Sequence, residues 1–109
     1  GPQGMRDLAT TILQNLAYLT AQLAKLKGVK IRFTGSGFQE VLVDFNGTGK
    51  TVRALNKALL RAKIFGGKDL SREFPELGQC ALYCVSELTT VEQMDNLVAA
   101  LKKITGRRA

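Results

Sequence analysis

The chain has 109 residues, of which 45% are hydrophobic and 23% are charged, as in an ordinary globular protein. This length suffices for one domain, residues 1–109, with a core that needs no disulfides. No apolar run approaches the ~20 residues of a membrane helix, and no secretory signal opens the chain, which predicts a cytoplasmic protein without membrane contact.

The formal net charge of +7 raises nucleic acid as a partner. The cations form two clusters, one around a helix end and strand start and one near the C-terminus: Lys25, Lys27, Lys30 and Arg32, and Lys102, Lys103, Arg107 and Arg108. Helix dipoles favour cations in a last turn, and no aromatic-studded RNA-binding motif accompanies them. We therefore expect a solvated face, with nucleic acid an unlikely partner and the role of the first cluster open.

Residues 5–27 carry the strongest helical pattern. Apolar side chains recur there every three or four residues: Leu8, Ile12, Leu16, Leu19, Leu23 and Leu26. This spacing keeps them on one helix face, and Gly28 supplies a left-handed stop.

The period then changes to two, which predicts a strand with Val29, Ile31 and Phe33 on one face. Residues 35–37 (GSG) form the expected turn, and residues 40–45 (EVLVDF) the return strand. The buried face of the return strand should carry Val41, Val43 and Phe45. Together they predict an antiparallel hairpin.

Residues 46–51 (NGTGKT) are similar to the end of a phosphate-binding P-loop, since Gly49-Lys50-Thr51 follows a strand and opens a helix. A full motif requires glycine at the position of Asp44, and the surrounding fold lacks the parallel sheet of such ATPases. We therefore interpret this segment as a helix-initiating turn rather than a nucleotide site.

The second helix is marked by Val52, Leu55, Leu59 and Leu60 and should end near residue 63. Two glycines, Gly66 and Gly67, then free the backbone for sharp turns or close approaches. A helix stop with a turn is the simpler interpretation. The alternative is a loop of Gly66, Gly67 and Asp69 that faces a cleft or a partner subunit.

A long polar connection, residues 68–79, precedes a third strand at residues 80–86. Because this strand is apolar at nearly every position, it should be central in the sheet or covered on both faces. Cys80 and Cys84 share a face of this strand roughly 13 Å apart, too far for a disulfide. No histidine or third cysteine completes a metal site, so we expect buried, structural free thiols.

The last helix begins at Thr90, with Gln93 completing a capping box. Its inner face should carry Val91, Met94, Leu97, Val98, Leu101 and Ile104. The order α-β-β-α-β-α predicts an α+β fold: a two-layer sandwich with a small, mainly antiparallel three-stranded sheet and helices packed on it.

Several motifs resemble the C-terminal end of subunit 1 of the two-subunit glycine dehydrogenase (decarboxylating), of the glycine cleavage system. They are GPQGMR at the start, I-x-G-G-x-D-L at residues 64–70, FPEL at residues 74–77, Ser86-Glu87 after the third strand, and T-x-E-x-x-D from Thr90. Gly1 and Pro2 are open to two interpretations, the scar of a cleaved tag and the family's own loop, and the continuing match of GPQGMR favours the second.

The resemblance implies the C-terminal small domain of a larger fold-type I pyridoxal-phosphate enzyme subunit. Its parent would be an oxidoreductase of glycine catabolism, a heterotetramer with subunit 2 that decarboxylates glycine and passes an aminomethyl group to a lipoyl carrier protein. The cofactor lysine would lie outside this chain. We therefore expect no catalytic, cofactor-binding or metal-binding residue here, and a structural role.

Glu87 stands where many fold-type I enzymes place an arginine that clamps the substrate carboxylate. A carboxylate cannot perform that role, so we expect Glu87 to form a salt bridge or a cap. Two alternatives remain: the small domain of another fold-type I enzyme, such as a cysteine desulfurase, and a free-standing basic α+β module that binds nucleic acid. The isolated chain could also dimerise through Met5, Leu8 and Ile12.

Overall fold

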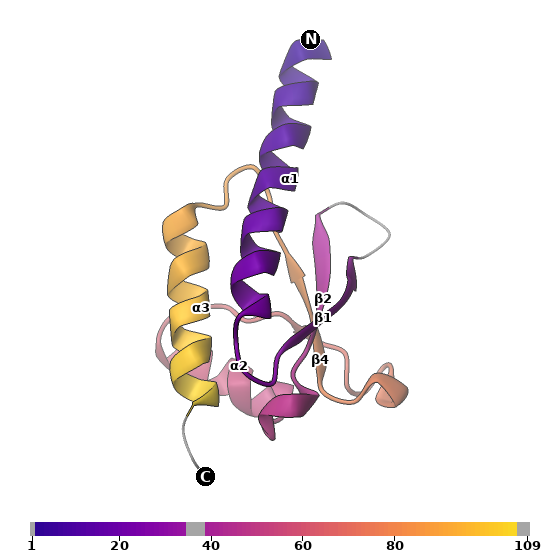
Figure 1. Cartoon of the computed structure of the whole chain (residues 1–109), viewed down its shortest axis with the longest axis vertical. Coiled ribbons are helices and arrows are strands. Elements are labelled where there is room, and N and C mark those ends of the chain that lie inside the picture. Colours follow the sequence, from indigo (N-terminus) through magenta and orange to yellow (C-terminus); the bar gives the residue numbers. More distant parts are fainter. Residues whose placement is uncertain (1, 35–38, 107–109) are drawn as a thin grey trace.

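The computed structural model describes residues 2–34 and 39–106, in which three α-helices pack on a four-stranded antiparallel sheet. Figure 1 shows the helices gathered on one side of the sheet, which confirms the α+β class. The same residues contain no helix long and apolar enough to cross a membrane.

Helix α1 (Pro2–Ala24) buries the expected apolar stripe through Ile12, Leu16, Leu19 and Leu23. It ends at Ala24, three residues earlier than predicted, and the chain then turns through Gly28, whose φ of 81° lies in the left-handed region. The first turns of the helix project beyond the sheet and the other helices (Figure 1).

Strands β1 (Lys30–Thr34) and β2 (Glu40–Asp44) form the expected hairpin, with Lys30 opposite Asp44 and an irregularity between Ile31 and Phe33. Val41, Val43 and Phe45 lie on the helix side of the sheet, as predicted, and all three are buried. The expected turn at residues 35–37 and the side chain of Phe33 lie outside the described part of the chain.

Strand β4 (Cys80–Cys84) lies between β2 and a short strand β3 (Lys68–Asp69), in the order β1-β2-β4-β3. The central position of β4 is confirmed. The prediction of three strands is wrong, because β3 lies within the segment interpreted as a polar connection. Two residues are too few to show an alternating pattern.

The two faces of β4 are covered differently. Ala81, Tyr83 and Val85 pack into the main core against the helices. On the opposite face Cys80 forms a small cluster with Leu42 and Leu70, which the connection after β3, including the short 3-10 helix η2 (Pro75–Leu77), helps to cover. The main core therefore lies between one sheet and one helix layer, which makes the two-layer sandwich.

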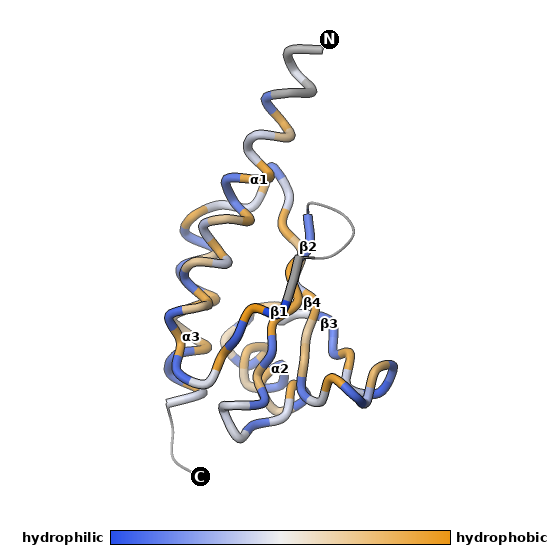
Figure 2. Tube along the Cα trace, turned by 45° about the vertical axis from the view of Figure 1, so that its right-hand side comes forward, coloured by the Kyte–Doolittle hydropathy of each residue, from blue (hydrophilic) through white to orange (hydrophobic). Residues whose placement is uncertain are grey.

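Helix α2 (Val52–Arg61) is capped by Thr51, whose Oγ1 accepts a hydrogen bond from the Ala54 backbone N–H. Helix α3 (Val91–Thr105) begins with the predicted capping box between Thr90 and Gln93. Helices α1 and α3 lie side by side (Figure 2), joined at their surface by a hydrogen bond from the Tyr18 hydroxyl to Asp95.

The expected inner-face position of Val91 is wrong, and Leu60, one of the residues that mark α2, lies outside the core. Leu60 of α2 is 59% exposed and Val91 of α3 is 53% exposed. Val91 directly follows Thr90, the cap of α3, and Leu60 directly follows the buried Leu59. Spacing alone places Leu60 beside the buried Leu59, but the sheet covers only the side that Leu59 occupies.

Candidate functional site

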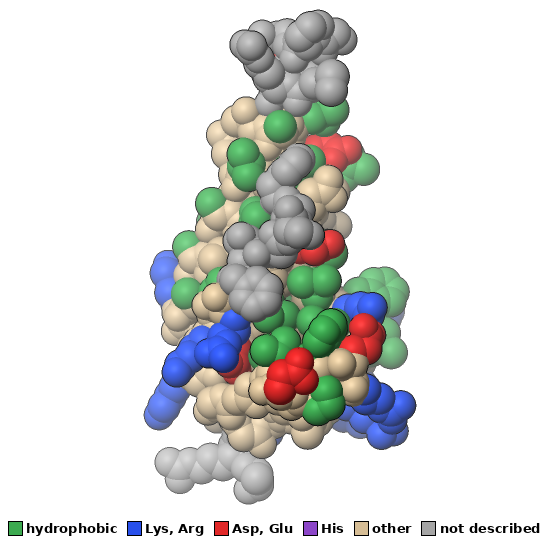
Figure 3. All heavy atoms as spheres, turned by 90° about the vertical axis from the view of Figure 1, so that its right-hand side faces the viewer, with side chains coloured by type: hydrophobic (Ala, Val, Ile, Leu, Met, Phe, Trp, Pro, Cys, Tyr) green, Lys and Arg blue, Asp and Glu red, His purple; other side chains and the backbone are tan. Residues whose placement is uncertain are grey.

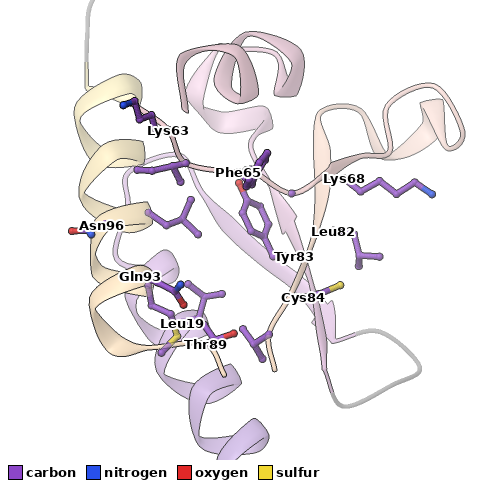
Figure 4. A pocket seen from close by; sticks show the side chains of 16 residues that line it. Leu19, Lys63, Phe65, Lys68, Leu82, Tyr83, Cys84, Thr89, Gln93 and Asn96 are labelled. Carbon is purple, nitrogen blue, oxygen red and sulfur yellow. The ribbon is translucent and has the colours of Figure 1, made fainter. Parts of the chain in front are cut away.

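A groove of about 620 Å³ lies between the segment at residues 63–68, strand β4 and the start of α3. Gly66 and Gly67, the candidate cleft residues, line it, whereas Asp69 does not. The Asp69 carboxylate instead accepts a hydrogen bond from the backbone N–H of Ser71 and shapes a turn. Figure 4 shows Tyr83 in the middle of the groove and Gln93 and Asn96 on the α3 side.

Close packing explains why two glycines stand in this wall. A Cβ atom on Gly67 would lie 2.6 Å from the ring of Tyr83 and 2.9 Å from the carbonyl oxygen of Leu82. A Cβ atom on Gly66 would meet the side chain of Asn56. Both glycines therefore allow the loop to lie directly on α2 and β4.

The expected helix stop lies three residues before Gly66. Lys63 has a φ of 62°, and its backbone N–H donates to the Leu60 carbonyl while that of Ile64 donates to the Leu59 carbonyl. These two bonds form a Schellman motif with a lysine where glycine is usual. The glycines serve close approach, and Lys63 supplies the left-handed turn.

Two asparagines that sequence patterns did not single out hold the groove walls. The Asn56 Nδ2 donates to the Gly67 carbonyl at 2.9 Å. The Asn15 Nδ2 donates to the carbonyls of Ser86 and Thr89, both at 2.9 Å, and so ties the loop between β4 and α3 to α1. The available signal was an asparagine inside each helix, where its propensity is poor.

Tyr83 connects the groove to the core. Its side chain is buried and packs against Phe45, with ring centroids 6.4 Å apart. Burial raises the pKa of Tyr83 to about 12, while a hydrogen bond with the Gly67 backbone opposes part of this rise. Tyr83 therefore stays protonated at neutral pH and acts as a packing and hydrogen-bonding group.

The groove walls are mainly apolar, and the two lysines that line it, Lys63 and Lys68, are exposed at its rim. Lys68 forms an ion pair with Glu73 at 3.3 Å and points away from α3 (Figure 4). An enzyme that uses pyridoxal phosphate needs a lysine for the aldehyde and donors for the phosphate. Both lysines of the described lining are exposed and Lys68 is already paired, so the lining offers no enclosed lysine for the aldehyde and does not fit this cofactor.

In the P-loop-like segment, polar groups form hydrogen bonds with one another. The Asp44 carboxylate accepts from the Asn46 backbone and side chain, both at 2.8 Å, and also pairs with Arg32 at 3.4 Å. The Lys50 N–H donates to the Thr48 hydroxyl instead of facing an open loop. Together with the short 3-10 helix η1 (Asn46–Thr48) and the cap at Thr51, these bonds confirm a helix-initiating turn.

Both cysteines are free thiols, as predicted, but only Cys80 is buried. The prediction of two buried cysteines is wrong for Cys84, because the covering segment after β3 reaches the Cys80 end of the strand and not its far end. Burial, followed by the charge of Asp44, raises the pKa of Cys80. Within residues 2–34 and 39–106, no three metal-binding side chains gather at one point.

Glu87 is exposed, and the loop that carries it is shaped by its neighbours. The Ser86 N–H donates to Thr89 Oγ1 at 3.0 Å, and the Leu88 N–H donates to Ser86 Oγ at 3.1 Å. Neither ion pair found in the described chain contains Glu87, and the cap of α3 is Thr90. The expected bridging or capping role is therefore filled by other residues.

Comparisons with known proteins give a consistent result, although no family model matches the sequence. The chain is 40% identical over 104 residues to the probable glycine dehydrogenase (decarboxylating) subunit 1 of Pyrococcus horikoshii, covering 95% of this chain and 22% of that protein. It is 39% identical to the protein of the same name from Desulfitobacterium hafniense, covering 95% of this chain and 23% of that protein. It is 44% identical to the one from Solibacter usitatus, covering 92% of this chain and 20% of that protein.

A solved structure of glycine decarboxylase (P-protein) of the glycine cleavage system, in inhibitor-bound form, superposes with a TM-score of 0.81 at 27% identity. The match covers 95% of this chain and 23% of that one. Neither a cysteine desulfurase nor a nucleic-acid-binding module is favoured by these findings. The chain therefore matches a domain of glycine decarboxylase subunit 1 of the glycine cleavage system, and it spans about a fifth of the length of these relatives.

Proposed function

We propose that the chain is the C-terminal small domain of subunit 1 of a cytoplasmic glycine decarboxylase. The whole enzyme would release carbon dioxide from glycine and pass the aminomethyl group to a lipoyl carrier protein, with subunit 2 as the partner in a heterotetramer. The observation that carries this proposal is the 40% identity over 95% of the chain to subunit 1 proteins. The TM-score of 0.81 to part of a glycine decarboxylase supports it.

Within that enzyme the domain would act by packing. Pyridoxal phosphate, when bound, supplies the electron sink for breaking the bond to the glycine carboxylate. The groove of this chain does not fit the cofactor, so its site would lie in the rest of the enzyme. Phe65 on the groove wall is 88% exposed and Leu88 on the loop before α3 is 79% exposed. Large exposed apolar side chains support the view that another part of the enzyme covers them.

Hydrogen bonds at the groove would hold this covered surface in a fixed shape. Asn56 holds Gly67 on α2, and Asn15 holds the loop that carries Leu88 against α1. Both contacts fix a wall whose apolar side chains face outward. Such a surface can exclude water from a neighbouring site without contributing a reacting group.

The proposal can be tested with a chimera of the Pyrococcus horikoshii subunit 1. Residues 1–109 of this chain would replace the segment that they match, and the chimera would be combined with the relative's subunit 2 and lipoyl carrier protein. Release of labelled carbon dioxide from carboxyl-labelled glycine is the readout. We expect the chimera to release carbon dioxide at a rate within about tenfold of that of the relative, because the fold is shared. A tenfold change in rate corresponds to ~1.4 kcal/mol in activation free energy.

A matched control places an unrelated α+β domain of the same length at this position, and it should be inactive. A chimera that assembles with subunit 2 but does not release carbon dioxide above this control would contradict the proposed role.

A further inference from the structure

Lysines from two distant parts of the chain meet at one end of the molecule. They line a second concavity, about 650 Å³ in volume, which we call the basic hollow. Its walls come from the end of α1, the end of α3 and η1. Its lining includes Gln22, Lys25, Lys27, Gly47 and Lys102.

The fold holds these cations together by backbone packing. After α1 the chain turns through bonds from the Lys25 N–H to the Gln22 carbonyl and from the Val29 N–H to the Leu26 carbonyl. At Gly28 it touches Gly47 so closely that a Cβ atom would lie 2.5 Å from the Gly47 carbonyl oxygen. This contact holds Gly47, which lines the basic hollow, against the turn that follows α1. The sequence suggested two separate basic clusters, but the parallel course of α1 and α3 brings Lys102 beside the first one.

The positive charge of the basic hollow is not neutralised within the described chain. No aspartate or glutamate lines it, and the two ion pairs found there join other residues, Arg32 with Asp44 and Lys68 with Glu73. The Lys25 ammonium lies 3.4 Å from the Gln22 amide oxygen, which is a neutral partner. On the face shown in Figure 3, which is a different face of the molecule, the described Lys and Arg side chains lie along both flanks, with Asp and Glu side chains between them. Arg107 and Arg108 follow Gly106 directly in the sequence.

The chemistry of the walls selects among anionic partners. Both helices present their C-terminal ends here, so these helix ends offer carbonyls and not the free backbone N–H groups that hold a compact phosphate. No aromatic ring lines the basic hollow on which a nucleic-acid base could stack. Flexible, exposed lysines around a concavity instead suit several separate carboxylates, each reached by its own ammonium group.

We propose that the basic hollow is a docking surface for an acidic segment of a protein, with Lys25, Lys27 and Lys102 as its main contacts. The attraction is between exposed charges, so it steers association and depends strongly on ionic strength. This role does not depend on the proposed function, because no residue that lines the basic hollow also lines the groove.

The test uses the full chain and a fluorescent peptide of about ten glutamates, with binding measured by anisotropy at low and high salt. The variant Lys25→Gln/Lys27→Gln/Lys102→Gln removes three charges from the basic hollow. The matched control, Lys57→Gln/Arg61→Gln/Arg72→Gln, removes three exposed charges that do not line it. Since all six side chains are exposed, both variants should keep the melting temperature of the wild type.

We expect the hollow variant to bind the peptide about tenfold or more weakly, and the control less than about threefold, because only the former removes direct charge contacts. Added salt should weaken wild-type binding in the same direction. Equal losses in the two variants, or no binding by the wild type, would overturn the proposal. Tighter binding of an oligothymidine of equal charge would also overturn it, in favour of a nucleic-acid surface.

Discussion

Gly67 is the residue at which the loop and the strand of the groove meet most closely. Its missing side chain leaves room for the Tyr83 ring and for the Leu82 carbonyl oxygen. We predict that Gly67→Ala destabilises the fold by about 1–3 kcal/mol, the usual cost of overpacking. Gly4→Ala is the control, because a Cβ atom at Gly4 meets nothing within 4 Å. Urea denaturation of both variants measures the difference, and equal midpoints would mean that the close approach at Gly67 does not constrain the fold.

Lys63 adopts a left-handed backbone that glycine adopts without strain. Lys63→Gly should therefore raise the free energy of unfolding by up to about 1 kcal/mol. Lys57→Gly, inside α2, should lower it by about the same amount because glycine is a poor helix former. Chemical denaturation would test both, and a Lys63→Gly variant as destabilised as Lys57→Gly would exclude the assigned helix stop.

The buried Tyr83 leads us to predict that the free energy of unfolding falls at alkaline pH. Burial raises the pKa of Tyr83 from the ordinary value of 10.0 to about 12, so the folded state holds the proton more tightly than the unfolded state. Its contribution to stability is complete below pH 10 and is lost as the pH rises toward 12, on the order of 2–3 kcal/mol in total. Denaturation as a function of pH should show this slope in the wild type. In Tyr83→Phe the slope should be smaller, and an unchanged slope would assign it to other groups.

At the scale of elements, periodicity predicted the helices well because each has one face on the same core. It located Leu16, Leu23 and Leu101 correctly. It failed at Val91, which the spacing placed on the inner face of α3 but which is 53% exposed. It also missed β3, whose two residues are fixed by pairing with Leu82 and Ala81 rather than by their own pattern.

The groove could be predicted only in part for a related reason. Gly66 and Gly67 are visible in the sequence as a pair with unusual backbone freedom. Their partners, Asn56, Tyr83 and Asn15, are brought to the groove by tertiary packing that no local spacing contains. The meeting of Lys25 with Lys102 depends in the same way on the parallel course of two helices that are far apart in the chain.

Truncation of the buried helix faces tests the packing of these elements. Leu16→Ala in α1 and Leu101→Ala in α3 should each cost on the order of 2–5 kcal/mol, since both side chains are buried in the main core. Lys27→Ala, at an exposed position, should be nearly silent. Equal melting temperatures of the three variants would show that the helix faces are misassigned.

At the scale of the whole molecule, the start of α1 projects beyond the core (Figure 1), and Leu8 and Leu13 on it are half exposed. The sequence suggested Met5, Leu8 and Ile12 as a dimer surface. Ile12 is buried within the chain and is removed from that surface, while the side chain of Met5 lies outside the described part. We propose that Leu8, which extends the buried stripe, pairs with a second copy when the chain is isolated.

Sedimentation at high concentration should therefore show a dimer of the isolated chain. Leu8→Glu should dissociate it without unfolding, whereas Leu60→Glu, at an exposed leucine of α2, should leave it intact. A monomeric wild type would exclude this pairing.

The central proposal is that this domain would complete a glycine decarboxylase while contributing no reacting group of its own. The most direct test is release of carbon dioxide from carboxyl-labelled glycine by three samples, each supplied with pyridoxal phosphate and lipoyl carrier protein: the isolated chain, the subunit 1 chimera with subunit 2, and the same assembly with the segment deleted. We predict release by the chimera alone. Release by the isolated chain, or undiminished release after deletion, would contradict the account.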